Sequence, residues 1–449
     1  MGNHYLTQKK PWTALILFAL PIIIGNLFQQ TYTMADSAIV GRFVGEEALA
    51  AVGASYSLTN IFISIAFGGG IGASVIVSRH FGAKKYNKMK LAVLTALLSF
   101  LLTSVLLGAV GLFLGRQIMT FLNTPPSILD MAVEYLNIYF LGLPFLFMYN
   151  VLSAMFNALG KSKIPLYFLI FSSLFNIALD LVMVKGFHMG IAGAAWATLM
   201  AQGISALLCF AVFLLVLRRL DCGRTKIFDP EQFKDMARVA LPSILQQSTV
   251  SVGMMLVQSV VNSFGSQALA GFSAATRVES LCFVPMQGIG NALSSYTAQN
   301  IGARRQERVP QGYRAANQMV IFCGILICLI LELFHTPVIT FFLGSTGTAK
   351  AIQTGNAYLT FMGWFFCLIG FKMAADGVLR GAGDMKMFTI ANLVNLSIRV
   401  ILSMTLAPVV GIGMVWYAVP IGWAANWAIS YRRYRTGKWR RVCPESSDG

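Results

Sequence analysis

Residues 91–114 read LAVLTALLSFLLTSVLLGAVGLFL, without one charged side chain. A helix needs about 20 apolar residues to cross the hydrocarbon of a bilayer, so this stretch is long enough to span one. Similar stretches lie on both sides of it, and we count twelve: 12–38, 48–78, 91–114, 131–156, 164–185, 190–217, 238–263, 268–298, 315–336, 351–379, 387–408 and 410–431. No run of alternating ten-residue strands suggests a barrel. The sequence therefore predicts an all-α membrane protein with twelve transmembrane helices.

The composition agrees with this class. Of the 449 residues, 56% are hydrophobic and only 11% are charged, whereas a soluble globular protein has about 25% charged residues. The first apolar segment is too long for a signal peptide and lacks a cleavage site, so we expect a retained helix. The odd number of cysteines shows no disulfide framework and no metal-ligand spacing.

The distribution of the basic residues behind the net charge of +17 indicates how the chain is oriented in the membrane. Most Lys and Arg residues fall in the even-numbered loops and in the two tails, whereas the outer loops hold only Arg42, Arg116, Lys185 and Lys350. Because basic residues collect on the cytoplasmic side, both termini are predicted to be cytoplasmic, in a plasma (inner) membrane. The basic residues then lie at the cytoplasmic surface of the lipid bilayer, and we expect no nucleic-acid partner.

The chain also contains an internal duplication. Residues 19–21 (ALP) recur at 240–242, 45–50 (GEEALA) match 265–270 (GSQALA), and 81–85 (FGAKK) match 301–305 (IGARR). The offset stays near 220 residues, and each half holds six spans, so the repeats enter the membrane in the same orientation. Parallel repeats of this kind form two bundles around a central cleft. We predict an N-lobe (1–219), a cytoplasmic connector (220–235), a C-lobe (236–432) and a cytoplasmic tail (433–449).

Polar side chains inside the N-lobe spans are the candidates for function. A charged residue at the centre of a membrane helix costs about 2.5–3.5 kcal/mol of insertion free energy. Asp36 and Asp180 are therefore expected to have a function that offsets this cost. Asn176 lies one turn before Asp180 on the same helix face, and Thr198 lies on the next span. Counted at 1.5 Å per residue, Asp36, Asp180 and Thr198 fall about 5–15 Å below the outer surface.

These four residue types suit two ions. Carboxylate, amide and hydroxyl oxygens are ligands for a hard cation such as Na⁺, and two neighbouring carboxyls can also hold a proton. If the ion is Na⁺, the metal ligands are Asp36, Asn176, Asp180 and Thr198. The alternative is that these groups only join helices by hydrogen bonds. Pro21 interrupts the hydrogen-bond ladder of the first span and provides either a helix bend during transport or a static kink.

The ordered motifs resemble the multidrug and toxic compound extrusion (MATE) family. They are Leu20-Pro21, Asp36, Val40-Gly41-Arg42 and 48–53 (ALAAVG), then Gly82-Ala83-Lys84, Gly302-Ala303 and 379–384 (LRGAGD). The resemblance covers both halves. It implies antiport of H⁺ or Na⁺ against a cationic or amphipathic drug, with the family's N-lobe cation site at the four residues above. The expected substrate cavity is lined by Gln29, Tyr32, Asn150, Ser173 and Gln202.

The C-lobe departs from one branch of that family, which carries membrane acids on spans seven and ten. Here span seven has none, and span ten carries Lys372 and Asp376, which are predicted to pair with each other. Glu279 is expected to pair with Arg277 or Arg399. These features argue against Na⁺ coupling in the C-lobe.

The sequence thus predicts a secondary antiporter that exports small organic cations or amphipathic molecules, working as a monomer. No P-loop, HExxH or nucleophile elbow is present, so we expect neither an enzyme nor a cofactor besides the coupling ion. Two other functions stay open. A flippase for a lipid-linked sugar would favour extra spans and a basic cavity, and a channel would favour a filter-like motif.

Overall fold

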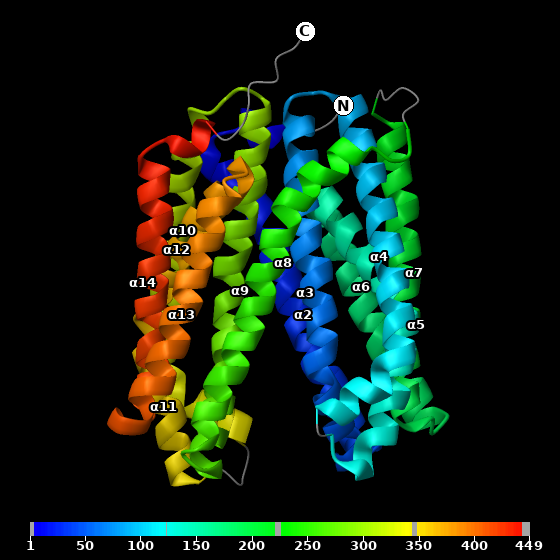
Figure 1. The fold of residues 1–449 in the computed structure, drawn as a ribbon, viewed down its shortest axis with the longest axis vertical. Coiled ribbons are helices and arrows are strands. Elements are labelled where there is room, and N and C mark those ends of the chain that lie inside the picture. Colours follow the sequence, from blue (N-terminus) through cyan, green and yellow to red (C-terminus); the bar gives the residue numbers. More distant parts are fainter. Residues whose placement is uncertain (1–3, 123, 221–225, 344–347, 442–449) are drawn as a thin grey trace. The chain divides into compact units, whose positions relative to one another are not determined.

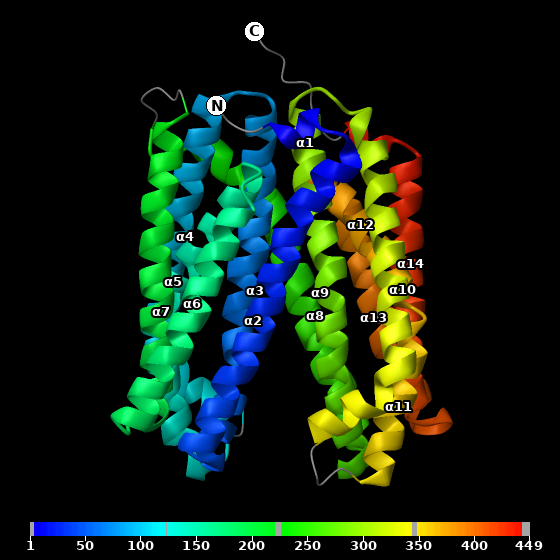
Figure 2. The same cartoon turned by 180° about the vertical axis from the view of Figure 1, so that it is seen from behind.

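The computed structural model describes residues 4–122, 124–220, 226–343 and 348–441. The described residues form helices and no β-strand (Figure 1). Residues 221–225 of the predicted connector and 442–449 of the predicted tail lie outside the described residues, as do Cys222 and Cys443. Figure 2 shows the short helix α1 (Tyr5–Gln8) and the long helix α2 (Pro11–Phe43) from behind.

Each half of the described chain contains six long helical segments. The first six are α2 (Pro11–Phe43), α3 (Glu46–Gly82), α4 (Tyr86–Phe121), α5 (Pro126–Ala158), α6 (Lys163–Asp180) continued by η1 (Leu181–Gly186), and α7 (Gly190–Arg218). The second six are α8 (Pro230–Asn262), α9 (Ser266–Gly302), α10 (Arg308–Leu343), α11 (Ala349–Gly363) continued by α12 (Phe366–Ala382), α13 (Met385–Val410) and α14 (Gly413–Arg435). A final 3₁₀ turn, η3, covers Lys438–Arg441. Eight helices, or nine with the α11–α12 pair, are long and apolar enough to cross a membrane by themselves.

The duplication is visible in the backbone. Helices α2 and α8 both have 33 residues, α3 and α9 both have 37, and α4 and α10 both have 36. Lys84 and Arg304, which are equivalent in the two repeats, both adopt left-handed conformations with φ of 58° and 57°. The prediction of an all-α membrane protein with twelve spans in two six-helix repeats is confirmed.

The chain forms two compact units, and two helices contribute to both. One unit is built mainly from Ile24–Ile244, and the other from Tyr5–Ile23 and Leu245–Gly449. Helix α2 passes from one unit to the other two residues after Pro21, and α8 does so two residues after Pro242. Both helices run unbroken through their prolines, so a bend at Pro21 stays a prediction.

Two local departures from regular α-helix were not predicted. Span ten, expected as one helix over 351–379, is bent by 54° between α11 and α12. The break follows Gly363, a weak helix former, and a short i→i+3 bond joins Phe365 N to Met362 O at 2.9 Å. The second departure is the π-helix η1, which begins directly after Asp180.

Glycines allow α3 to lie against the first half of α8 within the first unit. A Cβ added to Gly72 would lie 2.3 Å from Cα of Ala240, and one added to Gly68 would lie 2.8 Å from Cα of Ile244. Small residues of this kind let membrane helices pack backbone to backbone. The close approach leaves no room for a methyl group.

We therefore expect Gly72→Ala to destabilise the protein by about 1–3 kcal/mol, the usual cost of overpacking. The matched control is Gly53→Ala on the same helix, because a Cβ there meets nothing within 4 Å. Thermal unfolding of the purified proteins in detergent should show a lower midpoint for Gly72→Ala and an unchanged one for Gly53→Ala. Equal midpoints for the two variants would contradict the packing described here.

Candidate cation and substrate site

Helices α2, α6 and α7 carry the predicted cation-coupling residues of the first unit. Asp180 is the last residue of α6 and is 0% exposed, and Asn176 one turn earlier is 2% exposed. Asp36 on α2 and Thr198 on α7 are partly buried. Buried polar groups in a membrane helix need partners, so the contacts of these side chains decide what they do.

The Asn176 side chain joins α6 to α7. In the amide orientation that suits its neighbours, Nδ2 donates to Asp180 Oδ2 at 3.2 Å, and Oδ1 accepts from Thr198 Oγ1 at 3.3 Å and from Thr198 N at 3.2 Å. In this orientation the amide nitrogen faces the carboxylate, an acceptor, and the amide oxygen faces the two donors of Thr198. The structure thus brings three of the four predicted residues together.

The fourth residue, Asp36, joins them through Asp180. The two carboxyl groups lie within hydrogen-bonding reach of each other. Carboxylates without protons only accept hydrogen bonds, so a bond between two carboxyls requires that one of them is protonated. The Asp36–Asp180 pair is therefore a group that can bind and release a proton, as in other paired carboxyls.

Several oxygens at this site have no protein partner. Asp36 Oδ1, Asp180 Oδ1 and Ser173 Oγ are buried and accept or donate no hydrogen bond within the described part of the chain. Among the described residues, none of the groups that act on either carboxyl is basic. A buried carboxylate without a cationic partner is costly. The donor set of carboxylates, amide and hydroxyl fits a proton or a hard monovalent cation.

The backbone next to Asp180 is also irregular. The six-residue π-helix Leu181–Gly186 follows it directly, and Met189 N then bonds to Met183 O at 3.0 Å. Single π-helical turns occur often at functional sites, because they re-aim neighbouring side chains. Here the turn sets the end of α6, and hence Asp180, relative to the start of α7.

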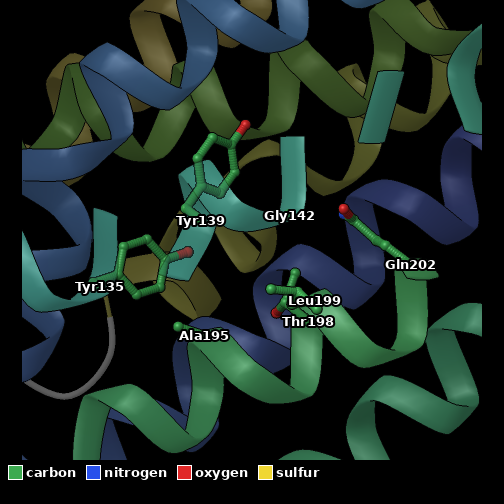
Figure 3. Close-up of a pocket in the computed structure, with 7 residues that line it drawn as sticks. All are labelled: Tyr135, Tyr139, Gly142, Ala195, Thr198, Leu199 and Gln202. Atoms are coloured by element: carbon green, nitrogen blue, oxygen red, sulfur yellow. The ribbon is translucent and has the colours of Figure 1, made fainter. Parts of the chain in front are cut away.

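A small pocket of about 10 Å³, room for roughly one water molecule, lies beside these residues. Figure 3 shows Tyr135, Tyr139 and Gly142 of α5 on one side and α7 on the other. Helix α7 contributes Ala195, Thr198, Leu199 and Gln202. Thr198 therefore belongs both to the pocket wall and to the polar cluster of Asn176 and Asp180. An occupant of the pocket would lie next to the predicted cation-coupling residues.

The predicted cavity residues fall in different places. Gln202 lines the pocket, and its side chain is hydrogen-bonded to Tyr32 of α2. Ser173 is buried on α6. Asn150 instead donates through Nδ2 to Leu146 O of its own helix at 2.8 Å, and Gln29 is exposed on α2. Neither Asn150 nor Gln29 is among the pocket-lining residues.

Sequence reasoning missed Tyr135 and Tyr139, which form the α5 wall. Their spacing of one helical turn inside an apolar span was a usable signal, because residues at i and i+4 share a helix face. Tyr139 Oη donates to Thr59 O of α3 at 3.4 Å. Aromatic faces in such a wall attract organic cations.

The charges of the second unit are arranged differently. Lys372 Nζ lies 3.0 Å from Asp376 Oδ2, which confirms the predicted pair. Glu279 accepts a hydrogen bond from Tyr358 Oη at 2.6 Å and interacts electrostatically with Arg399. Arg277 is exposed. The groups of three or more His, Cys, Asp or Glu that would hold a metal ion are absent from the described residues.

Two six-helix repeats of membrane-spanning helices with buried carboxylates inside them are typical of membrane transporters. The sequence model of the MatE family matches residues 21–182 and 242–405, so the chain belongs to this family. The motif resemblance is thereby confirmed.

Individual relatives match the chain over almost its whole length. The probable multidrug resistance protein YpnP of Bacillus subtilis is 29% identical, over 98% of this chain and 99% of its own. YoeA of the same organism, also named a probable multidrug resistance protein, is 28% identical over 96% of each chain. A solved MOP superfamily transporter from Pyrococcus furiosus is 25% identical, covers 98% of each chain and superposes with a TM-score of 0.90.

Proposed function

We propose that this protein is an antiporter that exports cationic or amphipathic small molecules, including drugs, in exchange for inward movement of H⁺ or Na⁺. The observation that carries the proposal is the Asp36–Asp180 pair, with one unpartnered buried oxygen on each carboxyl and with Asn176 and Thr198 beside it. A group of this kind holds one cation at a time and is more stable when that cation is bound.

The proposed exchange of substrate for coupling ion rests on Thr198, which the pocket wall and the polar cluster have in common. Thr198 lines the tyrosine-lined pocket and also donates a hydrogen bond to Asn176 Oδ1, so a cationic substrate beside this wall and the coupling ion act on one electrostatic environment. A substrate cation near the carboxyls lowers the affinity for a second cation, which favours exchange over co-transport. The multidrug resistance names of YpnP and YoeA support drugs as the substrate class.

The driving force is sufficient for export. A membrane potential of about 100 mV supplies about 2.3 kcal/mol for each inward elementary charge. Because about 1.4 kcal/mol corresponds to a tenfold ratio, one inward cation supports roughly a 50-fold gradient of a neutral substrate. A proton or sodium concentration gradient adds to this.

The two alternatives make different demands. A lipid-linked sugar would need a basic cavity for its phosphates, whereas the described pocket is lined by tyrosine, threonine, glutamine and apolar residues. A channel would need no proton-binding carboxyl pair beside its pocket. A channel cannot move a substrate against its own electrochemical gradient, and a flippase for a lipid-linked sugar would not move a small cationic dye.

Proteoliposomes that contain the purified protein test the proposal. A fluorescent cationic dye should move against its own gradient when a pH gradient or a Na⁺ gradient is imposed, and the gradient that drives it identifies the coupling ion. Movement under neither gradient would contradict antiport. Empty liposomes are the control for direct effects of the gradients on the dye.

We also propose that both termini face the cytoplasm, because basic residues dominate that side in the predicted topology. In a cysteine-free background, single cysteines at Lys85, Lys226 and Arg305 should react with an impermeant maleimide only from the cytoplasm. A cysteine at Lys350 should react only from outside. Labelling of position 226 in intact cells would refute this orientation.

A further inference from the structure

The second unit contains a buried polar cluster that the proposed antiport does not use. It consists of Lys372 and Asp376 of α12, Asn392 of α13, Ser430 of α14 and Gln246 of α8. Lys372 is 3% exposed, Asp376 2%, Asn392 7% and Ser430 0%. Taking two charges out of water is expensive, so a buried pair is weak evidence for stability and a reason to look for another role.

The Lys372 ammonium lies between two oxygens. Its Nζ donates to Asp376 Oδ2 at 3.0 Å and to Asn392 Oδ1 at 2.9 Å. Gln246 Nε2 also donates to Asn392 Oδ1, at 3.3 Å. One carboxylate oxygen and one amide oxygen therefore surround a positive nitrogen, as they would surround a monovalent metal ion.

The carboxylate of this cluster is fully partnered. Asp376 Oδ1 accepts from Ser430 Oγ at 2.8 Å, and Oδ2 accepts from Lys372 Nζ and from Asn392 Nδ2 at 3.2 Å. In the first unit, by contrast, Asp36 Oδ1 and Asp180 Oδ1 accept nothing from the described residues. Both units hold a buried carboxylate and an amide, but only the second supplies its own cation.

A second fixed charge opposes entry of a mobile cation. Arg380 lies one turn after Asp376 on α12 and is 7% exposed. Its guanidinium donates to Asn291 Oδ1 at 2.7 Å and to Ser294 Oγ at 3.3 Å, both neutral groups. These partners do not cancel its positive charge, which interacts electrostatically with Asp376 and so weakens the attraction of that carboxylate for a free cation.

We propose that Lys372 is a tethered cation that permanently fills a monovalent cation site formed by Asp376 and Asn392. The second unit then takes up no ion from solution. This inference goes beyond the proposed antiport and does not depend on it. It identifies Lys372 as the residue that occupies this site in place of Na⁺ or K⁺, while Arg380 further disfavours a free cation.

The test removes the tethered charge and asks whether a free cation replaces it. Lys372→Met keeps much of the side-chain volume and removes the ammonium that forms the ion pair with Asp376. All variants also carry Asp36→Asn, so that cation binding in the first unit does not contribute. Thermal midpoints are measured in Li⁺, Na⁺ or K⁺ chloride and in N-methylglucamine chloride at equal ionic strength.

We expect Lys372→Met to unfold several degrees higher in at least one small cation than in N-methylglucamine, because a ligand that binds only the folded state stabilises it. Without that substitution, the midpoint should not depend on the cation. The matched control, Lys372→Met with Asp376→Asn, should also be indifferent, because it has no charge to balance. The proposal is overturned if Lys372→Met responds no more than its controls.

Poor folding of Lys372→Met is also informative. Lys372→Gln, which keeps a hydrogen-bonding amide, then takes its place, with expression and purification in medium rich in all three small cations. If both single variants still fail while the double variant accumulates, a free cation cannot replace the ammonium and the proposal is wrong. Loss of the double variant as well would equally contradict it, because a site that only holds a cation is dispensable once both charges are gone.

Discussion

Asp36→Asn should reduce gradient-driven efflux to the level of empty liposomes while the protein still inserts and folds. The amide keeps the size of the carboxyl but cannot carry its charge or release a proton at physiological pH. Asp36 lies within hydrogen-bonding reach of Asp180, and its Oδ1 has no hydrogen-bond partner among the described residues. The substitution therefore removes one of the two groups that are proposed to hold the cation.

The measurement is export of a cationic dye by proteoliposomes at matched protein amounts under the driving gradient. A useful control is Asp130→Asn, because Asp130 pairs with Arg116 at 3.0 Å on the surface, where its side chain is 82% exposed. Exposed pairs contribute little, so this control should transport at the wild-type rate. Wild-type efflux by Asp36→Asn would remove the coupling role from the first unit.

Asp180→Asn should impair transport nearly as strongly, and the double variant should be barely worse than either single one. Residues that act as a unit show large departures from additivity. In the proposed mechanism Asp36 and Asp180 hold one cation between them, so losing either carboxyl should end coupling. The loss should exceed that of Thr198→Ala, which removes a neutral contact to Asn176 but leaves both carboxyls in place.

Initial rates for the two single variants and the double variant give the coupling between the sites. If each single substitution leaves appreciable efflux and the double one multiplies the two losses, the carboxyls act independently. That result would contradict a shared cation, although each residue could still matter by itself. Folding is checked for each protein by its thermal midpoint.

Much of the fold was predictable because membrane-spanning helices appear in the sequence as apolar stretches of about 20 residues. The apolar run 91–114 lies within α4, and the repeat of FGAKK at IGARR corresponds to identical left-handed turns at Lys84 and Arg304. What could not be predicted is local backbone geometry. Neither the bend after Gly363 nor the π-helix after Asp180 has a sequence pattern that sets it apart from ordinary helix.

The candidate site was predictable to the extent that burial of charge is costly. That cost singled out Asp36 and Asp180, and helical spacing added Asn176. Spacing within one helix does not reveal contacts between helices. Helical spacing therefore could not predict that Asn150 donates a hydrogen bond to its own helix or that Tyr135 and Tyr139 line the pocket. The same limit applies to the second unit, where Lys372 and Asp376 were paired but Asn392 and Ser430 were not foreseen.

The most direct test of antiport reverses the exchange. In proteoliposomes without an imposed ion gradient, adding a cationic drug on one side should drive the coupling ion out of the opposite compartment, detected with a pH- or Na⁺-sensitive dye inside. Antiport through the Asp36–Asp180 pair predicts this ion movement for the wild type and for Asp130→Asn, and none for Asp36→Asn. Drug uptake without ion movement in the wild type, or equal ion movement in Asp36→Asn, would contradict it.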